Sequence, residues 1–304
     1  MKKILVTGSN GFLGQKVVDL LSKAPQYEVV AISKSANRNP NQEGYDFSQV
    51  DLLDKDSVDH FLSAHVFDAI IHTAAMTSVE ACEADKTACQ RLNVDLVETL
   101  ASYCAKNNTQ LIHLSTDFVF DGRKGSLYIE DDIPNPQSEY GKSKYASEQI
   151  LLKTHCRFAI LRTILVYGIN ADPNRSNLVL WAKGKLSQGE AIKVVNDQWR
   201  MPTFVDDLAY ACQLAIERKA QGIFHISGSE LMSISEAVYR IADYWKLDTT
   251  LISEISAASI GQADNRPRQT GFDGNKSKEE LGYVPTPFRK SLEIIDKQYN
   301  EYRR

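Results

Sequence analysis

Residues 3–14 read KILVTGSNGFLG, and this stretch decides the fold. It begins as a short, mostly apolar run, continues with glycines in the spacing GxxGxxG, and leads into a helical pattern. Between a strand and a helix, such glycines permit a tight turn, let the backbone approach a pyrophosphate, and allow close packing of the helix on the strand. The stretch predicts a dinucleotide-binding βα unit, with a purely structural turn as the alternative. The cofactor-binding residues expected here are Gly8, Asn10, Gly11, Phe12, Leu13 and Gly14.

Short apolar runs alternate with longer helical patterns up to about residue 163. Strands are expected at residues 3–6, 29–33, 69–73, 110–115 and 158–162, and helices at residues 11–22, 55–64, 86–107 and 139–153. This order predicts an α/β fold of the Rossmann type, a doubly wound parallel sheet with helices on both faces. Right-handed crossovers place the carboxyl ends of these strands at one edge, where such sheets bind ligands.

The pattern is less regular in the second half of the chain. Helices are expected at residues 177–185, 205–217, 233–245, 276–281 and 288–299, and strands at residues 192–195 and 223–226. We interpret residues 1–163 as an NAD(P)-binding Rossmann domain and residues 164–304 as a smaller C-terminal α/β lobe that binds the substrate. The two late strands either belong to this lobe or rejoin and extend the core sheet.

The composition argues against several classes of protein. The 304 residues carry a formal net charge of −4 with no basic block, so nothing favours a nucleic-acid partner. No charged leader with an apolar segment opens the chain, and no apolar run approaches the roughly 18 residues of a membrane span. The five cysteines lack the close spacing of metal ligands and are expected to be reduced thiols. We therefore expect a cytoplasmic protein without a membrane partner.

The residues after the second predicted strand indicate the cofactor. An NAD-binding Rossmann unit carries an acidic residue here, which binds the ribose 2′-hydroxyl. This chain instead has Ser33 and Lys34, followed by Arg38, so two cations are available for the 2′-phosphate of NADP. NADP(H) is therefore favoured over NAD(H). The alternative is that both cations are solvated loop charges.

Further cofactor contacts are expected from position along the chain. Asp51 and Leu52 come after the segment that follows the second strand, and we predict that they lie beside the adenine. Ala74 and Ala75 follow the third strand, and we predict that they line the nicotinamide ribose side. Both expectations rest on the shared carboxyl edge of a parallel sheet.

Tyr140 and Lys144 are spaced i and i+4 and therefore share one face of a predicted helix. The fourth predicted strand leads into Ser115 and Thr116, at the edge where the glycine turn places the nicotinamide. Reduction of a ketone by a hydride requires a proton, and a tyrosine with a pKa near 10 is a weak acid. We expect Lys144 to lower that pKa and to hold the nicotinamide ribose, and Thr116, or else Ser115, to donate to the substrate oxygen. The alternative is a packed Tyr and a solvated Lys.

Together these residues resemble the dTDP-4-dehydrorhamnose reductase family of extended short-chain dehydrogenases. The resemblance is carried by the glycine turn, Ala74-Ala75, STDFVFDG at 115–122, YxxxK at 140–144, NDQ at 196–198, PTFVDDLA at 202–209 and Arg266-Pro267. It covers most of the chain and implies NAD(P)H-dependent reduction of a 4-keto nucleotide sugar, as in dTDP-rhamnose biosynthesis. It further implies a Thr116, Tyr140 and Lys144 catalytic triad, with Asn196, Gln198 and Arg266 as substrate contacts, and it leaves a homodimer open.

Two positions depart from the pattern that this resemblance implies. Bacterial rhamnose reductases often place a Trp beside the sugar where this chain has Leu165, so that stacking surface is lost. Some of them place a magnesium-binding glutamate just after the third glycine, where this chain has Lys16. We therefore predict no metal at this position, and a sugar that differs from that of the bacterial enzymes.

A second resemblance and a second chemistry are alternatives. GIFHISG at 222–228, QWRMPT at 198–203 and RPR at 266–268 are similar to the regulatory β subunit of methionine adenosyltransferase, a catalytically silent NADP-binding partner of another protein. Because this chain keeps the Thr, Tyr and Lys, an enzyme is favoured. A nucleotide-sugar epimerase or dehydratase is the nearest enzymatic rival, since Asp117 stands next to Thr116, where a dehydratase uses an acidic residue.

Overall fold

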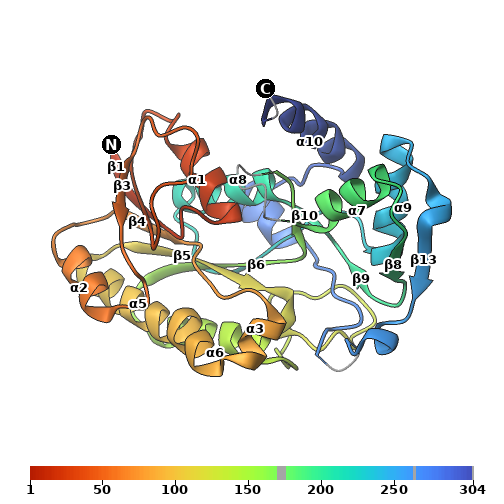
Figure 1. Ribbon diagram of the computed structural model, residues 1–304. Coiled ribbons are helices and arrows are strands. Elements are labelled where there is room, and N and C mark those ends of the chain that lie inside the picture. The colour runs from red at the N-terminus through yellow and green to blue at the C-terminus, as the bar shows by residue number, and fades with distance from the viewer. Residues whose placement is uncertain (170–175, 263–264, 303–304) are drawn as a thin grey trace.

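The computed structural model describes residues 1–169, 176–262 and 265–302. Within these residues seven parallel strands form the central sheet (Figure 1). In spatial order they are β11 (Gly222–Ile226), β6 (Arg157–Thr163), β5 (Gln110–Thr116), β4 (Ala69–His72), β1 (Lys2–Thr7), β2 (Tyr27–Ser33) and β3 (Asp46–Gln49). The strand order reverses direction between β1 and β4. The predicted Rossmann-type, doubly wound sheet is thereby confirmed, and the reversal is where such sheets bind ligands.

The pairing register of the central strands aligns their carboxyl ends at one edge of the sheet. Thr7 pairs with His72, His72 pairs with His113, and Thr116 pairs with Thr163. The central strands are almost completely buried because helices cover both faces, which explains their near-continuous apolar sequences. Residues that follow β1, β4 and β5 therefore meet at one edge of the sheet.

Helices cover both faces of the sheet (Figure 1). One face carries α1 (Phe12–Leu21) and α8 (Val205–Glu217), which pack against each other. The opposite face carries α2 (Lys55–Ser63), α5 (Leu96–Asn107) and α6 (Glu139–Lys153). Each layer has its own buried apolar cluster, so the site edge is held from two sides. No helix among the described residues is long and apolar enough to cross a membrane.

The single helix expected at residues 86–107 is interrupted in the structure. Its segments are α4 (Lys86–Gln90), the π-helical turn η1 (Arg91–Asp95) and α5, and a further short helix, α3 (Val79–Ala84), precedes them. Asn93 in η1 is buried, and its Nδ2 donates to the Met76 carbonyl and to Ser143 Oγ, each at 3.0 Å. The wider turn thus inserts a polar side chain between α6 and the segment after β4.

A smaller lobe lies beside the sheet (Figure 1). Its strand pairs are β8 (Ile192–Val195) with β13 (Ile252–Ile255), β9 (Trp199–Arg200) with β12 (Met232–Ser233), and β10 (Thr203–Phe204) with β7 (Val166–Tyr167). Its helices are α7 (Leu178–Ser187), α9 (Ile234–Trp245) and α10 (Phe288–Tyr302), which share a third apolar cluster. The short helical turns are η2 (Asp117–Val119), η3 (Thr249–Leu251), η4 (Ala257–Ile260) and η5 (Ser277–Leu281). The chain returns to the Rossmann layers through β11 and α8, which complete the sheet and one of its faces.

Candidate active site

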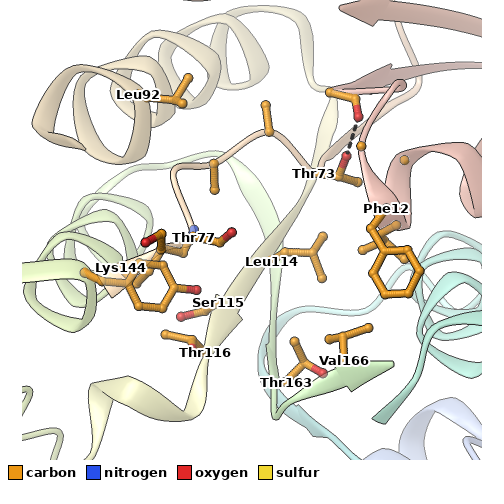
Figure 2. Close-up of a pocket in the computed structure, with 18 of the residues that line it drawn as sticks. Phe12, Thr73, Thr77, Leu92, Leu114, Ser115, Thr116, Lys144, Thr163 and Val166 are labelled. Carbon is orange, nitrogen blue, oxygen red and sulfur yellow. Dashed lines mark hydrogen bonds between the residues drawn. The ribbon is translucent and has the colours of Figure 1, made fainter. Parts of the chain in front are cut away.

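A cavity of about 700 Å³ lies at the carboxyl edge of the sheet (Figure 2). Figure 2 shows Phe12 and Val166 on one side of it and Ser115, Thr116 and Lys144 on the other. The predicted site residues that line it are Gly8, Asn10, Gly11, Phe12, Leu13, Gly14, Ser33, Lys34, Arg38, Asp51, Leu52, Ala74, Ala75, Thr116, Tyr140, Lys144 and Arg266. The fold therefore brings the glycine turn and the YxxxK helix to the walls of one cavity.

Thr77, Ser78, Val79 and Glu80 also line the cavity, although sequence reasoning gave this segment no role. The available signal was the helix start at α3, where the Ser78 side chain accepts from the Ala81 amide. A serine at the first position of a helix is a common cap and does not by itself indicate a binding site. The segment faces the cavity because it directly follows the carboxyl end of β4.

The glycine turn has room for no side chain at its tightest points. Gly8 has φ +68°, a left-handed conformation that favours glycine. A Cβ on Gly14 would lie 2.2 Å from the Gly8 carbonyl oxygen, and a Cβ on Gly8 would lie 2.8 Å from the Ala74 backbone. The turn therefore packs α1 and the segment after β4 closely together. Such a cradle, beside a helix N-terminus with free amide groups, fits a pyrophosphate.

Asn10 organises the loop that carries Arg38. Its Nδ2 donates to the Ser35 and Ala36 carbonyls at 3.2 and 2.8 Å, and its Oδ1 accepts from the Arg38 amide at 2.8 Å. Asn10 is 6% exposed, so it acts from within the glycine turn. This side chain fixes the loop after β2 against the turn and brings Arg38 to the cavity wall.

Lys34 is engaged at the same end of the cavity. Its ammonium lies 3.0 Å from Asp51 Oδ2, and both side chains are exposed. The pKa of Asp51 is lowered by the hydrogen bond from the Leu53 amide and by Lys34. An exposed pair of this kind is worth little and exchanges readily with a ligand. Lys34 is therefore in reach of this end of the cavity without being locked to Asp51.

Two hydroxyl residues at the end of β5, Ser115 and Thr116, line the cavity, and their hydrogen bonds differ. Thr116 Oγ1 donates to Asp117 Oδ1 and accepts from the Phe118 amide, each at 3.2 Å. Ser115, the other candidate, donates to Glu148 Oε1 at 2.5 Å within a buried network. Long bonds leave the Thr116 hydroxyl easier to redirect, whereas Ser115 is committed. The geometry therefore favours Thr116.

The start of α6 is pressed against η2. A Cβ on Gly141 would lie 2.3 Å from the Phe118 carbonyl oxygen, so only glycine permits this approach. Ser138 caps the helix by accepting from the Gly141 amide, and the Tyr140 ring meets the edge of Phe118 at 5.7 Å. This contact sets Tyr140 beside Thr116. One helical turn later, Lys144 enters the same cavity.

The two ionisable groups differ from the expectation for an activated tyrosine. Desolvation in the cavity raises the pKa of Tyr140, with a hydrogen bond from Thr116 opposing and the charge of Asp117 reinforcing the rise. Burial lowers the pKa of Lys144 to about 8, and Glu148 opposes that shift. The expected lowering of the Tyr140 pKa is therefore not found, because desolvation dominates and Lys144 is not among the groups that act on Tyr140 most strongly. Tyr140 is a protonated donor at neutral pH.

A buried ion pair fixes the strands behind the site. Arg162 on β6 donates to both carboxylate oxygens of Glu148 on α6, at 2.9 and 2.7 Å, and both side chains are at most 2% exposed. Glu148 also accepts from Ser115, so the end of β5 is tied to α6. Arg162 continues to the Glu130 carbonyl and to His225 Nε2, each at 3.4 Å.

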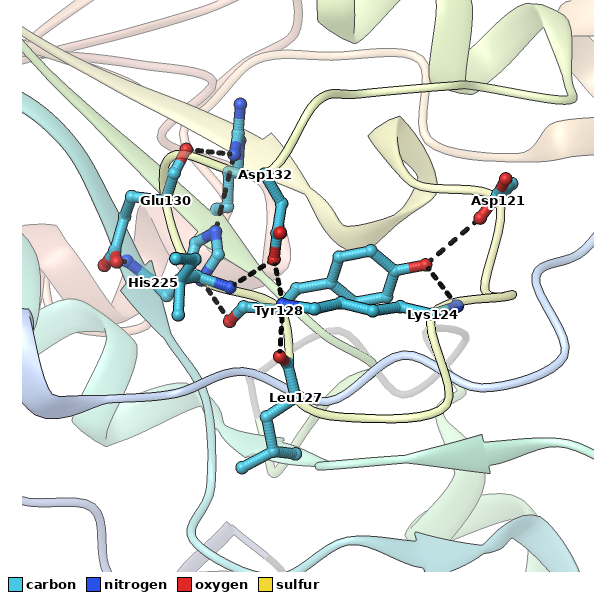
Figure 3. A network of polar contacts seen from close by, with 9 residues as sticks. Asp121, Lys124, Leu127, Tyr128, Glu130, Asp132 and His225 are labelled. Atoms are coloured by element: carbon cyan, nitrogen blue, oxygen red, sulfur yellow. Dashed lines mark hydrogen bonds and ion pairs between the residues drawn. The ribbon is translucent and has the colours of Figure 1, made fainter.

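The loop between β5 and α6 is held by a second polar network (Figure 3). The Lys124 ammonium contacts Asp132 Oδ2 at 2.5 Å and donates to the Leu127 carbonyl at 2.9 Å. The Tyr128 hydroxyl donates to Asp121 at 3.1 Å, and the Glu130 carboxylate accepts from the His225 amide. The first contacts hold the loop together, and the Glu130 contact ties it to β11.

The predicted substrate residues divide into two groups. Arg266 lines the cavity, and its Nη2 lies 2.5 Å from Oε1 of Glu80, which also lines it. Asn196 and Gln198 do not line it. Asn196 follows β8 and donates to Glu254 on the neighbouring strand. The Gln198 carbonyl accepts from the Ile234 amide, and its side chain is buried under the lobe.

The two positions that depart from the family pattern, Leu165 and Lys16, also have defined surroundings in the structure. Leu165 lines the cavity in a left-handed conformation with φ +40°, unusual for a leucine. The Lys16 ammonium lies 2.9 Å from Asp206 Oδ1 and 3.3 Å from Gln298 Oε1. Lys16 therefore joins α1 to α8 and α10.

Three buried histidines predict an acid-sensitive fold. Burial lowers the pKa of His72 to about 3 and the pKa values of His113 and His225 well below the ordinary value. The unfolded chain binds protons at these sites below about pH 6.5, whereas the folded chain does not, so the free energy of unfolding falls as pH falls. Each histidine contributes a slope of up to about 1.4 kcal/mol per pH unit.

Urea unfolding between pH 7.5 and 5.0 measures this slope. In the variant His72→Leu we expect a slope smaller by the contribution of one histidine, whatever the change in stability at pH 7.5. The exposed His60 supplies the control, and His60→Gln is expected to keep the slope of the unmodified chain. Equal slopes in all three proteins would contradict the assignment.

The comparisons with known proteins agree with this geometry. The family model described as RmlD substrate binding domain matches residues 1–300. The dTDP-4-dehydrorhamnose reductase of Aggregatibacter actinomycetemcomitans is 30% identical over 97% of this chain and 98% of its own. Methionine adenosyltransferase 2 subunit beta of Bos taurus is 31% identical over 99% of this chain and 90% of its own.

A solved structure is similar over nearly the full length. The dTDP-4-dehydrorhamnose reductase of Bacillus anthracis str. Ames, in complex with NADP, superimposes with a TM-score of 0.82. It is 26% identical and covers 98% of this chain and 99% of that one. The likeness therefore extends over both the Rossmann layers and the smaller lobe.

Proposed function

Because the chain belongs to the RmlD substrate binding domain family, we propose that it is an NADP(H)-dependent reductase of a 4-keto nucleotide sugar. One observation carries the proposal. Thr116, Tyr140 and Lys144 line the same cavity as the glycine turn, so a proton donor and a dinucleotide cradle face one space. The relatives named dTDP-4-dehydrorhamnose reductase support the substrate class.

Thr116, Tyr140 and Lys144 each have a separate role in the proposed reduction. A bound nicotinamide cofactor supplies a hydride for the carbonyl carbon. Thr116 orients the carbonyl oxygen by a hydrogen bond, and Tyr140 transfers its proton to that oxygen as the alkoxide develops. Lys144 holds the ribose hydroxyls and stabilises the resulting phenolate by its charge. The Tyr140 hydroxyl is protonated at neutral pH, as a proton donor must be, although desolvation makes it a weaker acid in the absence of bound cofactor and substrate.

The position of Asp117 favours reduction over dehydration. Its Oδ2 accepts from Thr270 Oγ1 at 2.5 Å and lies 3.5 Å from Arg200 Nε, while its Oδ1 accepts from Thr116. Asp117 is 2% exposed. Asp117 lines the cavity, but Thr270 and Arg200 hold its Oδ2, so we infer that it anchors the end of β5 to the smaller lobe rather than carrying a proton in an elimination.

The preference for NADP(H) rests on the cations after β2. In Arg38→Glu we expect the Kd of NADPH to rise about 10- to 100-fold, because a charge-assisted contact to the 2′-phosphate becomes a repulsion. The Kd of NADH is expected to stay nearly unchanged. Fluorescence titration measures both constants, with the exposed Lys106→Glu as a control for net charge. An equal loss for the two cofactors would refute a 2′-phosphate site at Arg38.

The direct test is NADPH oxidation with 4-keto-6-deoxy sugars carrying dTDP or UDP, with the product identified. Turnover to the 4-hydroxy sugar is expected. Tight NADPH binding without turnover of any of them would favour the second candidate, a regulatory subunit, to which the 31% identity with methionine adenosyltransferase 2 subunit beta points. A pull-down with a methionine adenosyltransferase would then follow. The homodimer and the cytoplasmic location remain predictions, which light scattering and fractionation test.

A further inference from the structure

The ammonium of Lys144 lies within hydrogen-bond distance of a buried histidine. Lys144 is 3% exposed, and its Nζ lies 3.2 Å from Nε2 of His113 on β5. Within the described part of the chain, this is the hydrogen-bond partner of Nζ. A buried ammonium without an acceptor is costly, so the contact decides how Lys144 keeps its charge.

The setting of His113 keeps its ring neutral. It is completely buried, and its neighbour on β4, His72, stacks on it with ring centroids 5.7 Å apart. Burial lowers the pKa of both rings, and the charge of Lys144 lowers them further. A neutral imidazole carries one lone pair, and at Nε2 that lone pair is available to an ammonium.

A serine constrains which tautomer His113 adopts. Ser147 Oγ donates to the Lys144 carbonyl at 2.7 Å and lies 2.9 Å from His113 Nε2. With a bare Nε2, the histidine accepts from the Lys144 ammonium, and Ser147 either turns its proton to Nε2 or faces it with a lone pair. The proton of the ring is then on Nδ1, which is buried and has no hydrogen-bond partner among the described residues. With a protonated Nε2, the histidine donates to Ser147 and faces Lys144 with an N–H, which suits only the uncharged amine. The tautomer of His113 and the charge of Lys144 are therefore coupled.

The other ionisable neighbours of Lys144 do not replace this contact. Glu148 acts on it through its charge, but both carboxylate oxygens are taken by Arg162, and one of them also by Ser115. The buried thiols of Cys82 and Cys89, on α3 and α4, lie near enough to act on Lys144 electrostatically.

Three further ionisable groups in the surroundings of Lys144 are Tyr140, Asp117 and His72. Tyr140 shares the cavity with Lys144 and stays protonated at neutral pH, because desolvation raises its pKa. Asp117 is held by Thr270 and Arg200. His72 hydrogen-bonds Thr7 through Nδ1. None of these contacts supplies an acceptor for the ammonium.

We propose that His113 is a positioning residue for the reaction, whose neutral Nε2 accepts a hydrogen bond from the Lys144 ammonium and keeps it charged and directed into the cavity. The role in turnover rests on the proposed reductase function. The contact itself also governs cofactor binding, since Lys144 would hold the nicotinamide ribose. The two consequences can be measured separately.

The experiment compares His113→Leu, His113→Gln and His72→Leu with the unmodified protein. For each, the Kd of NADPH and kcat with a 4-keto nucleotide sugar are measured from pH 6 to 10. In the unmodified protein, affinity and kcat are expected to fall as pH rises through about 8, where Lys144 loses its charge. In His113→Leu the midpoint is expected to move about 1 to 2 pH units lower, because a hydrogen bond to the charged form is gone.

The other variants separate positioning from packing. Gln places an acceptor where Nε2 stands, so His113→Gln is expected to return the midpoint most of the way. His72→Leu removes a buried histidine of the same kind without touching Lys144 and is expected to keep the midpoint. A midpoint in His113→Leu equal to that in His72→Leu, with both folded by circular dichroism, would overturn the proposal.

The outcome is independent of the sugar. If no keto sugar turns over but the NADPH midpoint shifts in His113→Leu and returns in His113→Gln, the reductase function fails and the His113 contact stands. If turnover is normal and neither midpoint shifts, the reductase function stands and the His113 role is refuted. Should His113→Leu fail to fold, an unshifted midpoint in His113→Asn, which lacks an acceptor at the Nε2 position, would overturn the role.

Discussion

Tyr140→Phe is expected to lower kcat by about 10²- to 10⁴-fold and to leave the Kd of NADPH nearly unchanged. The variant keeps the ring that packs on Phe118 and removes only the hydroxyl that supplies the proton. General acid catalysis by a positioned side chain contributes a factor of this size. Steady-state NADPH oxidation and a fluorescence titration of the cofactor measure the two quantities.

Tyr145→Phe is the matched control for that variant. Tyr145 lies on the same helix, is partly buried and does not line the cavity. Its loss of a hydroxyl is expected to change kcat less than twofold or so, since it touches no reacting atom. If Tyr140→Phe and Tyr145→Phe behave alike, Tyr140 is not the acid.

Glu148→Gln is expected to lower the free energy of unfolding by about 3 to 5 kcal/mol. The substitution keeps the shape of the side chain but leaves the charge of Arg162 buried without its partner. The matched surface change Glu190→Gln, which breaks the exposed contact with Lys185, is expected to cost no more than about 1 kcal/mol. Urea unfolding at pH 7.5 measures both.

The paired replacement tests the cause of that loss. Glu148→Leu combined with Arg162→Met removes both charges, so most of the stability lost in Glu148→Gln is expected to return. Should the double variant be as unstable as the sum of its single variants, the unpaired charge is not the reason. That result would indicate that Glu148 and Arg162 stabilise the fold by their packing rather than by neutralising each other's charge.

The Rossmann-type sheet could be predicted because most of its strands are short apolar runs that alternate with helical patterns. The edge strand β3 could not, since it reads DFSQ and is partly exposed, so no apolar pattern marks it. The π turn at Asn93 was also hidden, because it needs an acceptor from α6 that is distant in sequence.

The site was predictable where spacing alone fixes geometry. The glycine turn and the i, i+4 pair of Tyr140 and Lys144 do so, and both line the cavity. Asn196 and Gln198 were expected there only through the resemblance, and the structure places them on the lobe, outside the cavity. The pKa of Tyr140 was expected to fall, but desolvation depends on packing that sequence does not report.

The most direct measurement uses NADPH deuterated at C4 of the nicotinamide, prepared in both C4 forms, with a 4-keto-6-deoxy dTDP sugar. Mass spectrometry follows the sugar and the oxidised cofactor. One form is expected to deliver deuterium to C4 of the sugar, with one NADP+ formed for each alcohol. Conversion of the sugar without net oxidation of the cofactor would contradict the reductase function and indicate an epimerase or a dehydratase.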